Sequence, residues 1–131
     1  MPHLEKLEAL SFMLGEWVVT GVVHLSPVRG EARVRAILDG AWIEYTEVID
    51  GYSDLCLYGV GEDGDLVVHH FTSEGIADVH AVLPREGGGF HWVPSGLGPV
   101  VRLVPDEEGF RCEVGRFEAG ALDVRLVFRR P

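Results

Sequence analysis

Histidine and aspartate side chains in the middle of the chain are the residues best suited to chemistry. Two successive runs, 65–73 and 76–84, alternate apolar and polar residues as half-buried β-strands do. A tight turn between these runs would place His70 opposite Asp78 and diagonal to His80 on one face of the sheet. Because imidazoles and carboxylates exchange protons readily, this face is a candidate acid–base or ligand-binding surface.

A third histidine follows on the next strand. A turn near Gly87 would set His91 diagonal to His80 on the same face. Phe90 and Trp92 would then lie on the opposite face. This arrangement depends on the strand register, because a slip of one residue moves every side chain to the other face.

The surroundings of these four residues leave several interpretations open. The same face carries Leu66, Val68, Ile76 and Val82, so it is too apolar for a solvated surface and too polar for a dry core. Three imidazoles and a carboxylate match the ligands of a transition metal. They also fit a cavity lining, a dimer contact or scattered surface positions. A cavity lining, a dimer contact and scattered surface positions are favoured over metal binding and catalysis, because those two functions require the side chains to converge closely.

Other side chains extend the candidate ligand-binding set. Tyr45 and Tyr58 lie in the middle of strands, where a phenol can point its hydroxyl into a cavity. His69 faces away from His70, between two apolar residues, and is expected to be a buried histidine. We assign no catalytic and no metal-ligating residue. The candidate ligand-binding residues are Tyr45, Tyr58, His69, His70, His80, His91 and Trp92.

Familiar catalytic and cofactor motifs are otherwise missing from the sequence. Residues 59–64 read GVGEDG and match GxGxxG, but a strand follows them where dinucleotide binding needs a helix. We predict a hairpin turn there. The sequence has no GxSxG nucleophile motif. Cys56 and Cys112 lack CxxC spacing and are expected to be reduced, buried thiols.

Ten strands are predicted to position these side chains. Turn residues separate short alternating runs, among them Ser26-Pro27 after the first run, and no second helical window appears. The predicted strands cover 16–25, 31–39, 41–50, 54–61, 65–73, 76–84, 89–94, 98–105, 109–116 and 120–130. An open sheet of this size would expose two edges, so we predict an all-β, ten-stranded antiparallel up-and-down barrel.

One end of the barrel is predicted to be closed by the chain termini. Leucines at helical spacing predict a short helix over residues 3–13, which Gly15 ends. In a closed meander the first and last strands are antiparallel neighbours, which brings Arg130, or Arg129 or Arg125 in another register, near Trp17. A guanidinium group over that indole would stabilise the closure. Gly15, Trp17 and Arg130 are therefore expected to be structural.

Length and composition describe one globular domain over residues 1–131. The net charge of −10 argues against nucleic acid and anionic membranes as partners. No apolar segment has the pattern of a signal peptide or the ~20 residues of a membrane helix, so a cytoplasmic protein is expected. The absence of Asn and Gln fits a thermophilic source, although a GC-rich genome would bias composition similarly.

The motif Gly15-Glu16-Trp17, with a late arginine, resembles the signature of calycins, which include lipocalins and fatty-acid-binding proteins. With the segments 38–42 and 58–75, it is similar to a bacterial lipocalin-like family of unknown function. Nitrobindins, which are ten-stranded haem-binding barrels, look similar at their opening. Their haem-binding histidine comes late in the chain, whereas this sequence has none after His91. The resemblance thus implies a ligand-binding barrel and disfavours haem.

These observations lead to one functional expectation with three alternatives. We expect a non-enzymatic barrel that holds a small apolar or amphipathic molecule in its interior. The alternatives are a homodimeric interaction module with a filled barrel, a His-based isomerase, cyclase or hydrolase, and a haem-binding protein. The enzyme requires the histidines to converge inside the barrel within hydrogen-bond reach, whereas the interaction module uses the histidine-bearing face as a dimer surface.

Overall fold

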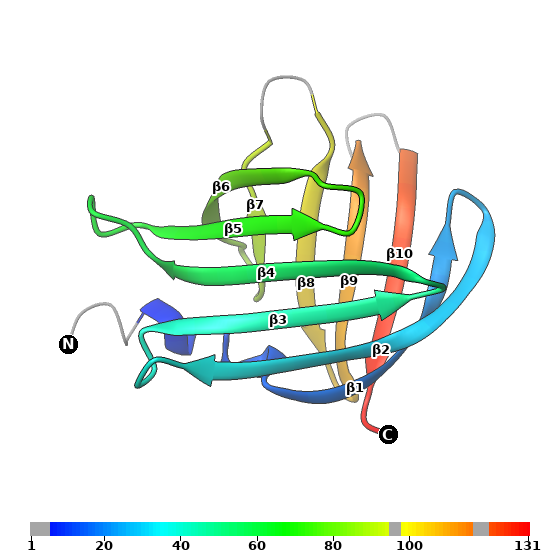
Figure 1. Ribbon diagram of the computed structural model, residues 1–131, viewed down its shortest axis with the longest axis horizontal. Coiled ribbons are helices and arrows are strands. Elements are labelled where there is room, and N and C mark those ends of the chain that lie inside the picture. Colours follow the sequence, from blue (N-terminus) through cyan, green and yellow to red (C-terminus); the bar gives the residue numbers. More distant parts are fainter. Residues whose placement is uncertain (1–5, 95–97, 117–120) are drawn as a thin grey trace.

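Ten antiparallel strands form a closed up-and-down barrel, as the sequence predicts (Figure 1). The computed structural model describes residues 6–94, 98–116 and 121–131. The strands are β1 (Gly15–Val23), β2 (Ser26–Ile37), β3 (Trp42–Ile49), β4 (Tyr52–Val60), β5 (Leu66–Thr72), β6 (Ala77–Pro84), β7 (Phe90–Trp92), β8 (Val100–Asp106), β9 (Gly109–Arg116) and β10 (Ala121–Arg129). Each strand pairs with its neighbours in sequence, and β1 pairs with β10 to close the barrel.

The barrel has two facing walls whose strands cross. In Figure 1, β3, β4 and β5 run across the direction of β8, β9 and β10. Alternate residues of both walls point inward, as the burial pattern of β3 shows: Ile43, Tyr45, Glu47 and Ile49 are buried, and Val48 between the last two is exposed. The interior therefore receives one side chain in two from every strand.

A short helical segment covers one end of this interior. Within the predicted helix, residues 6–8 are helical and η1 (Ser11–Met13) is a 3-10 turn, whereas residues 3–5 lie outside the described part of the chain. Leu7, Leu10 and Met13 are buried beneath the barrel wall. In the part of the chain that the structure describes, no helix is long and apolar enough to cross a membrane.

Arg130 packs over the Trp17 ring at this end of the barrel, as predicted. The Arg130 guanidinium carbon lies 4.0 Å from the centre of the Trp17 ring, and the indole Nε1 donates a 2.7 Å hydrogen bond to the Met13 carbonyl. Gly15 has φ +134°, and a Cβ there would lie 1.8 Å from Nη1 of Arg130. Only glycine leaves room for the arginine to reach the indole.

The first hairpin differs from the prediction. β2 begins at Ser26 instead of residue 31, and the turn is formed by His24 and Leu25, not by Ser26-Pro27. Both turn residues have positive φ, 47° and 71°, which is the backbone of a two-residue type I′ turn. The proline pairs near the start of β2, a position at which strands tolerate proline. The GVGEDG segment is a hairpin turn, as predicted, with Gly64 at φ +87°.

Candidate functional site

The barrel encloses a cavity of about 610 Å³ at the end opposite the helical segment. Four predicted residues line it: Tyr45, Tyr58, His70 and Trp92. Apolar side chains make up the wall formed by β1, β2, β8 and β10, including Val23, Val28, Val101, Leu103, Val124 and Leu126. Residues of the turns after β1, β3 and β5 also line the cavity, so its mouth lies among these turns.

Polar side chains that line the cavity form a band across β3, β4 and β5, which we call the polar strip: Tyr45, Glu47, Asp54 and His70. Strand register explains the band. Glu47 lies directly opposite Asp54, and Asp54 is diagonal to His70 on the next strand. One wall of the cavity is therefore polar and the other apolar.

Glu47 is the buried carboxyl group of the polar strip. Its residue is 6% exposed, and its Oε1 accepts a hydrogen bond from the hydroxyl of Tyr45. Burial raises the pKa of Glu47 to about 8; the Tyr45 hydroxyl opposes the rise, and the adjacent Asp54 adds to it. At neutral pH the Glu47 carboxyl group is therefore mostly protonated and can donate a hydrogen bond to Asp54.

His70 lies between two carboxylates. Its Nε2 is 3.2 Å from Oδ1 of Asp54, and its Nδ1 is 3.1 Å from Oδ1 of Asp78. A protonated imidazole, with a hydrogen on each nitrogen, can donate to both carboxyl groups at once. The hydrogen bond to Asp54 raises the pKa of His70, burial opposes this, and Asp78 adds to the rise. The two carboxyl groups thus favour the protonated form of the ring.

Asp78 and His80 extend the network beyond the cavity lining. The predicted pairing of His70 with Asp78 is confirmed by the β5–β6 register. His80 Nε2 lies 3.3 Å from Oδ1 of Asp78, and its Nδ1 lies 3.0 Å from the carbonyl of Val93. The His80 ring also stacks on Trp92, with centroids 5.5 Å apart. Asp78 and His80 thus do not line the cavity themselves but hold the rings of His70 and Trp92 in position.

Trp92 connects the polar strip to the apolar wall. Its Nε1 donates a 3.1 Å hydrogen bond to the Tyr58 hydroxyl. That bond satisfies two buried polar atoms at the base of the cavity and fixes both rings. Cys56 and Cys112 also line the cavity, and burial raises the pKa of both thiols. Both cysteines are free, and Cys112 is only half-buried.

The predicted position of His91 is wrong. His91 pairs with Leu83, and Trp92 pairs with the buried Val82, so the register is one residue away from the predicted one. Phe90 and Trp92 therefore point inward and His91 points outward. The cause is the preceding loop, in which Gly87, Gly88 and Gly89 all have positive φ. Three glycines in a row allow several loop geometries, so the sequence does not fix the register.

His69 also lies outside the cavity. It faces outward, half-buried, and its ring packs edge-on against Trp42 with centroids 5.7 Å apart. The indole of Trp42 covers Gly59, where a Cβ would lie 2.4 Å from the ring. The expected buried histidine is thus a partly covered histidine of the outer face.

Glu47 and Asp54 are the members of the polar strip that the sequence interpretation missed. Strand alternation contained the signal, because Glu47 shares a face with Ile43, Tyr45 and Ile49. A carboxylate on an apolar face is unusual and marks either a buried pair or a site. Asp54 stands beside the predicted turn at 50–51, where an aspartate is ordinary, so its role could not be recognised there.

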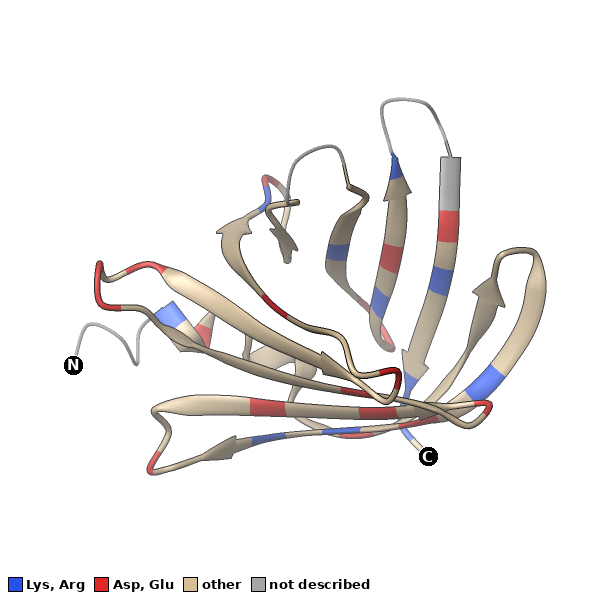
Figure 2. Cartoon of the chain, turned by 45° about the horizontal axis from the view of Figure 1, so that its top comes forward, with Lys and Arg blue, Asp and Glu red and all other residues tan. Residues whose placement is uncertain are grey.

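Charge is distributed unevenly around the barrel (Figure 2). Strands β3 to β7 contain Glu44, Glu47, Asp54 and Asp78 but no Lys or Arg, whereas β2, β8, β9 and β10 carry arginines. The residues that line the cavity include carboxyl groups and histidines but no Lys or Arg. The segments 1–5, 95–97 and 117–120, which lie outside the described residues, contain no Lys or Arg in their sequence. The cavity thus has no strong cation to hold an anionic ligand.

His70 is not placed as a ligand for a haem iron or another metal ion. Within the described ranges, no group of three or more His, Cys, Asp or Glu side chains is placed to hold a metal ion. Iron binds an imidazole nitrogen that carries no hydrogen, and both nitrogens of His70 face carboxylate oxygens.

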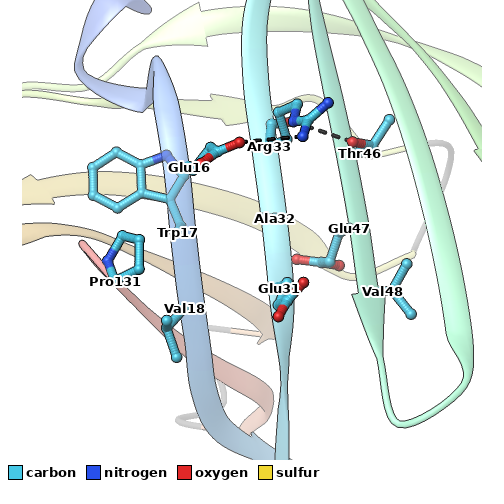
Figure 3. Close-up of a pocket in the computed structure, with 10 residues that line it drawn as sticks. All are labelled: Glu16, Trp17, Val18, Glu31, Ala32, Arg33, Thr46, Glu47, Val48 and Pro131. Carbon is cyan, nitrogen blue, oxygen red and sulfur yellow. Dashed lines mark hydrogen bonds and ion pairs between the residues drawn. The ribbon is translucent and has the colours of Figure 1, made fainter.

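A second, shallower pocket of about 320 Å³ lies near the C-terminus, between β1, β2 and β3 (Figure 3). Two of its polar side chains form an ion pair, Arg33 with Glu16 at 3.2 Å, and the Thr46 hydroxyl donates to the Arg33 carbonyl. Both members of the ion pair are largely exposed, so the pair contributes little. The interior cavity is the better candidate site.

Comparison of the sequence with known protein families and with curated proteins finds no match. The case for function therefore depends on the geometry of the cavity.

Proposed function

We propose that the protein binds a small apolar or amphipathic molecule inside the barrel. The observation that carries this proposal is the cavity of about 610 Å³, with one apolar wall and one polar wall. Binding sites for small molecules are usually concave and mostly apolar, with a few polar groups that orient the ligand. The helical segment fills one end of the barrel and leaves the other as the entrance.

A relationship to calycin barrels belongs to the same proposal. The Gly15, Trp17 and Arg130 arrangement and the ten-stranded closure agree with that resemblance. We propose that the chain is a divergent barrel of this kind, whose ligand occupies the interior.

The proposal is tested by native mass spectrometry of freshly purified protein and by titration with the neutral dye Nile red. We expect a co-purified molecule or dye binding with enhanced fluorescence. Leu126→Trp fills the cavity from the apolar wall and should weaken dye binding at least about tenfold, since a well-packed cavity excludes the ligand.

The matched control is Val127→Trp on the same strand. Burial alternates along β10, with Leu126 and Phe128 buried, so Val127 points outward. This variant should bind Nile red like the wild type. Equal binding by Leu126→Trp and the wild type would place the dye on the surface and contradict the proposal. A wild type with neither adduct nor dye binding would also contradict it.

Proton transfer on the bound molecule is a second candidate function. It is favoured by the contact between Asp54 and His70 on the cavity wall, since proton transfer needs titratable groups within hydrogen-bond reach of each other. The test is 2-decanone in D₂O, in which a base would remove a proton next to the carbonyl and return a deuteron. Catalysis predicts faster deuterium incorporation with the wild type than with Asp54→Asn. Equal rates would exclude this activity for the probe.

A further inference from the structure

The polar strip offers carboxyl groups to a ligand and offers no Lys or Arg. Along the cavity wall, Glu47 and Asp54 face each other across β3 and β4, within the barrel and below the β3–β4 turn. Asp50 and Glu74 add two more carboxyl groups at the mouth. Any positive charge on His70 is already paired with Asp54 and Asp78, which lie 3.2 Å and 3.1 Å from its ring nitrogens. A carboxylate or phosphate head group would therefore meet net negative charge.

The apolar wall fixes the other half of the ligand. Val101, Leu103 and Leu126 line the cavity opposite the polar strip, and Tyr58 and Trp92 close its base. A ligand that fits both walls has an apolar body that lies deep and a polar head that lies toward the mouth. Aromatic rings near the carboxyl groups are also compatible with a cationic head.

We propose that the ligand is an amphipathic amine, whose ammonium head is bound by Glu47 and Asp54 and whose apolar body fills the cavity. This inference rests on the proposed function, and it names the class of molecule for that same cavity. The ammonium group would donate its hydrogens to the two facing carboxyl groups, as charge-assisted hydrogen bonds require. It would take the place of the proton on the buried Glu47 carboxyl group.

Binding is then linked to proton release. The titratable groups that face Glu47 are Tyr45 on its own strand, His70 on β5, Cys112 from the facing wall, and Asp54, Cys56 and Tyr58 on β4. Without ligand, burial keeps the Glu47 carboxyl protonated at neutral pH, because its pKa is raised to about 8. A bound ammonium cation stabilises the carboxylate, so the proton leaves. Amine affinity should therefore rise between pH 6 and pH 8.

Three decyl compounds with the same chain and different heads test the inference: decylamine, 1-decanol and decanoate. Isothermal titration calorimetry on the wild type at pH 7 should give the tightest binding for decylamine, at least about tenfold over 1-decanol. Decanoate should bind more weakly than 1-decanol. The decylamine titration should show a heat that depends on the ionisation enthalpy of the buffer, which reports the released proton.

Variants locate the head group. The double variant Glu47→Gln, Asp54→Asn should reduce decylamine affinity to that of 1-decanol and leave 1-decanol binding unchanged. The control is Glu44→Gln, which removes a carboxylate from the same strand but on the outer face, where Glu44 pairs with Arg35. This control should bind decylamine like the wild type.

The outcomes separate the two proposals. If none of the three decyl compounds binds the wild type, the proposed function fails. If 1-decanol or decanoate binds at least as tightly as decylamine, the cavity is a binding site but the amine inference is wrong. If the double variant keeps the preference for decylamine, the amine does not bind at Glu47 and Asp54. The wild-type comparison needs no variant, so it decides the ligand class even if the double variant does not fold.

Discussion

Glu47 shows how one residue can link the cavity to the stability of the fold. The carboxyl group is buried in the polar strip, and its environment excludes the charged form. A protonated carboxyl group can both accept from Tyr45 and donate to Asp54, so the neutral acid satisfies its neighbours without a net charge. The cost of this arrangement is a stability that depends on pH.

Stability should fall as the pH rises from about 5 to 8. The Glu47 pKa is raised from 4.5 to about 8, so the folded state binds more protons than the unfolded chain in this window. One such group contributes up to about 1.4 kcal/mol per pH unit. The raised pKa of His70 acts in the same direction, because its contribution is also lost as the pH rises through the folded-state value.

Urea unfolding at pH 5, 6, 7 and 8 measures this dependence. Glu47→Gln mimics the protonated acid in shape and hydrogen bonding, so its stability should change less steeply with pH than that of the wild type. Glu44→Gln, on the outer face, should keep the wild-type slope. An unchanged slope in Glu47→Gln would show that the buried carboxyl group does not hold its proton.

At the scale of the element, the β1–β2 hairpin contains a turn residue that does not suit its backbone. Leu25 has φ +71° and is 95% exposed, so it gains no packing for adopting a left-handed conformation. Left-handed backbone costs an L-residue other than glycine about 1–2 kcal/mol. The side chain therefore destabilises the turn.

Leu25→Gly should stabilise the protein by about 1 kcal/mol, after allowance for the greater freedom of glycine in the unfolded chain. Leu25→Ala is the matched control, because it removes the same exposed side chain and keeps the Cβ. The midpoint of urea unfolding should rise for the glycine variant and stay close to that of the wild type for alanine. Equal midpoints for the two variants would contradict the backbone explanation.

The same hairpin shows where sequence interpretation works and where it stops. Alternation and turn residues predict ten strands and the pairing of His70 with Asp78, because the Ser73–Gly75 turn leaves little choice of register. Leu25 conceals the first turn, since an apolar residue gives no turn signal. The triple glycine at 87–89 allows a one-residue slip, which moves His91 out of the site.

The candidate site was predictable only in part, for a related reason. Histidines are natural candidates for a site because an imidazole can titrate or bind a ligand wherever it lies. Of the four candidate histidines, only His70 lines the cavity. Glu47 and Asp54 are ordinary residue types whose role depends on burial and on the strand opposite. Burial is a property of the closed barrel, so it cannot be assigned before closure is known.

At the scale of the whole molecule, the barrel divides stability and function between its two ends. Aromatic packing fills the closed end, where Phe110 and Phe128 stack with centroids 4.1 Å apart and Trp17 contacts Phe110 edge-on at 5.0 Å. The other end holds the cavity and the polar strip. Such a division allows a site that contains buried polar groups, since the closed end stabilises the fold independently.

Gly15→Ala tests the closure of the barrel. The new Cβ would collide with Arg130 and the backbone would be strained at φ +134°, so we expect a loss of about 1–3 kcal/mol in the free energy of unfolding. Arg130→Ala should cost about 0.5–2 kcal/mol through the lost contact with Trp17. The double variant should cost less than the sum, because it removes the collision. Additive losses in urea unfolding would contradict the steric link.

The seam between β1 and β10 has a further consequence, for the kinetics of folding. Every other strand pair joins neighbours in sequence, so it can form as a hairpin, whereas the seam joins Val18 to Arg129 near the two ends of the chain. The seam bears the loop-closure entropy of nearly the whole chain, and we expect it to form last. Contacts made after the transition state govern the rate of unfolding. The contact between Trp17 and Arg130 should therefore set the lifetime of the closed barrel and leave its rate of formation nearly unchanged.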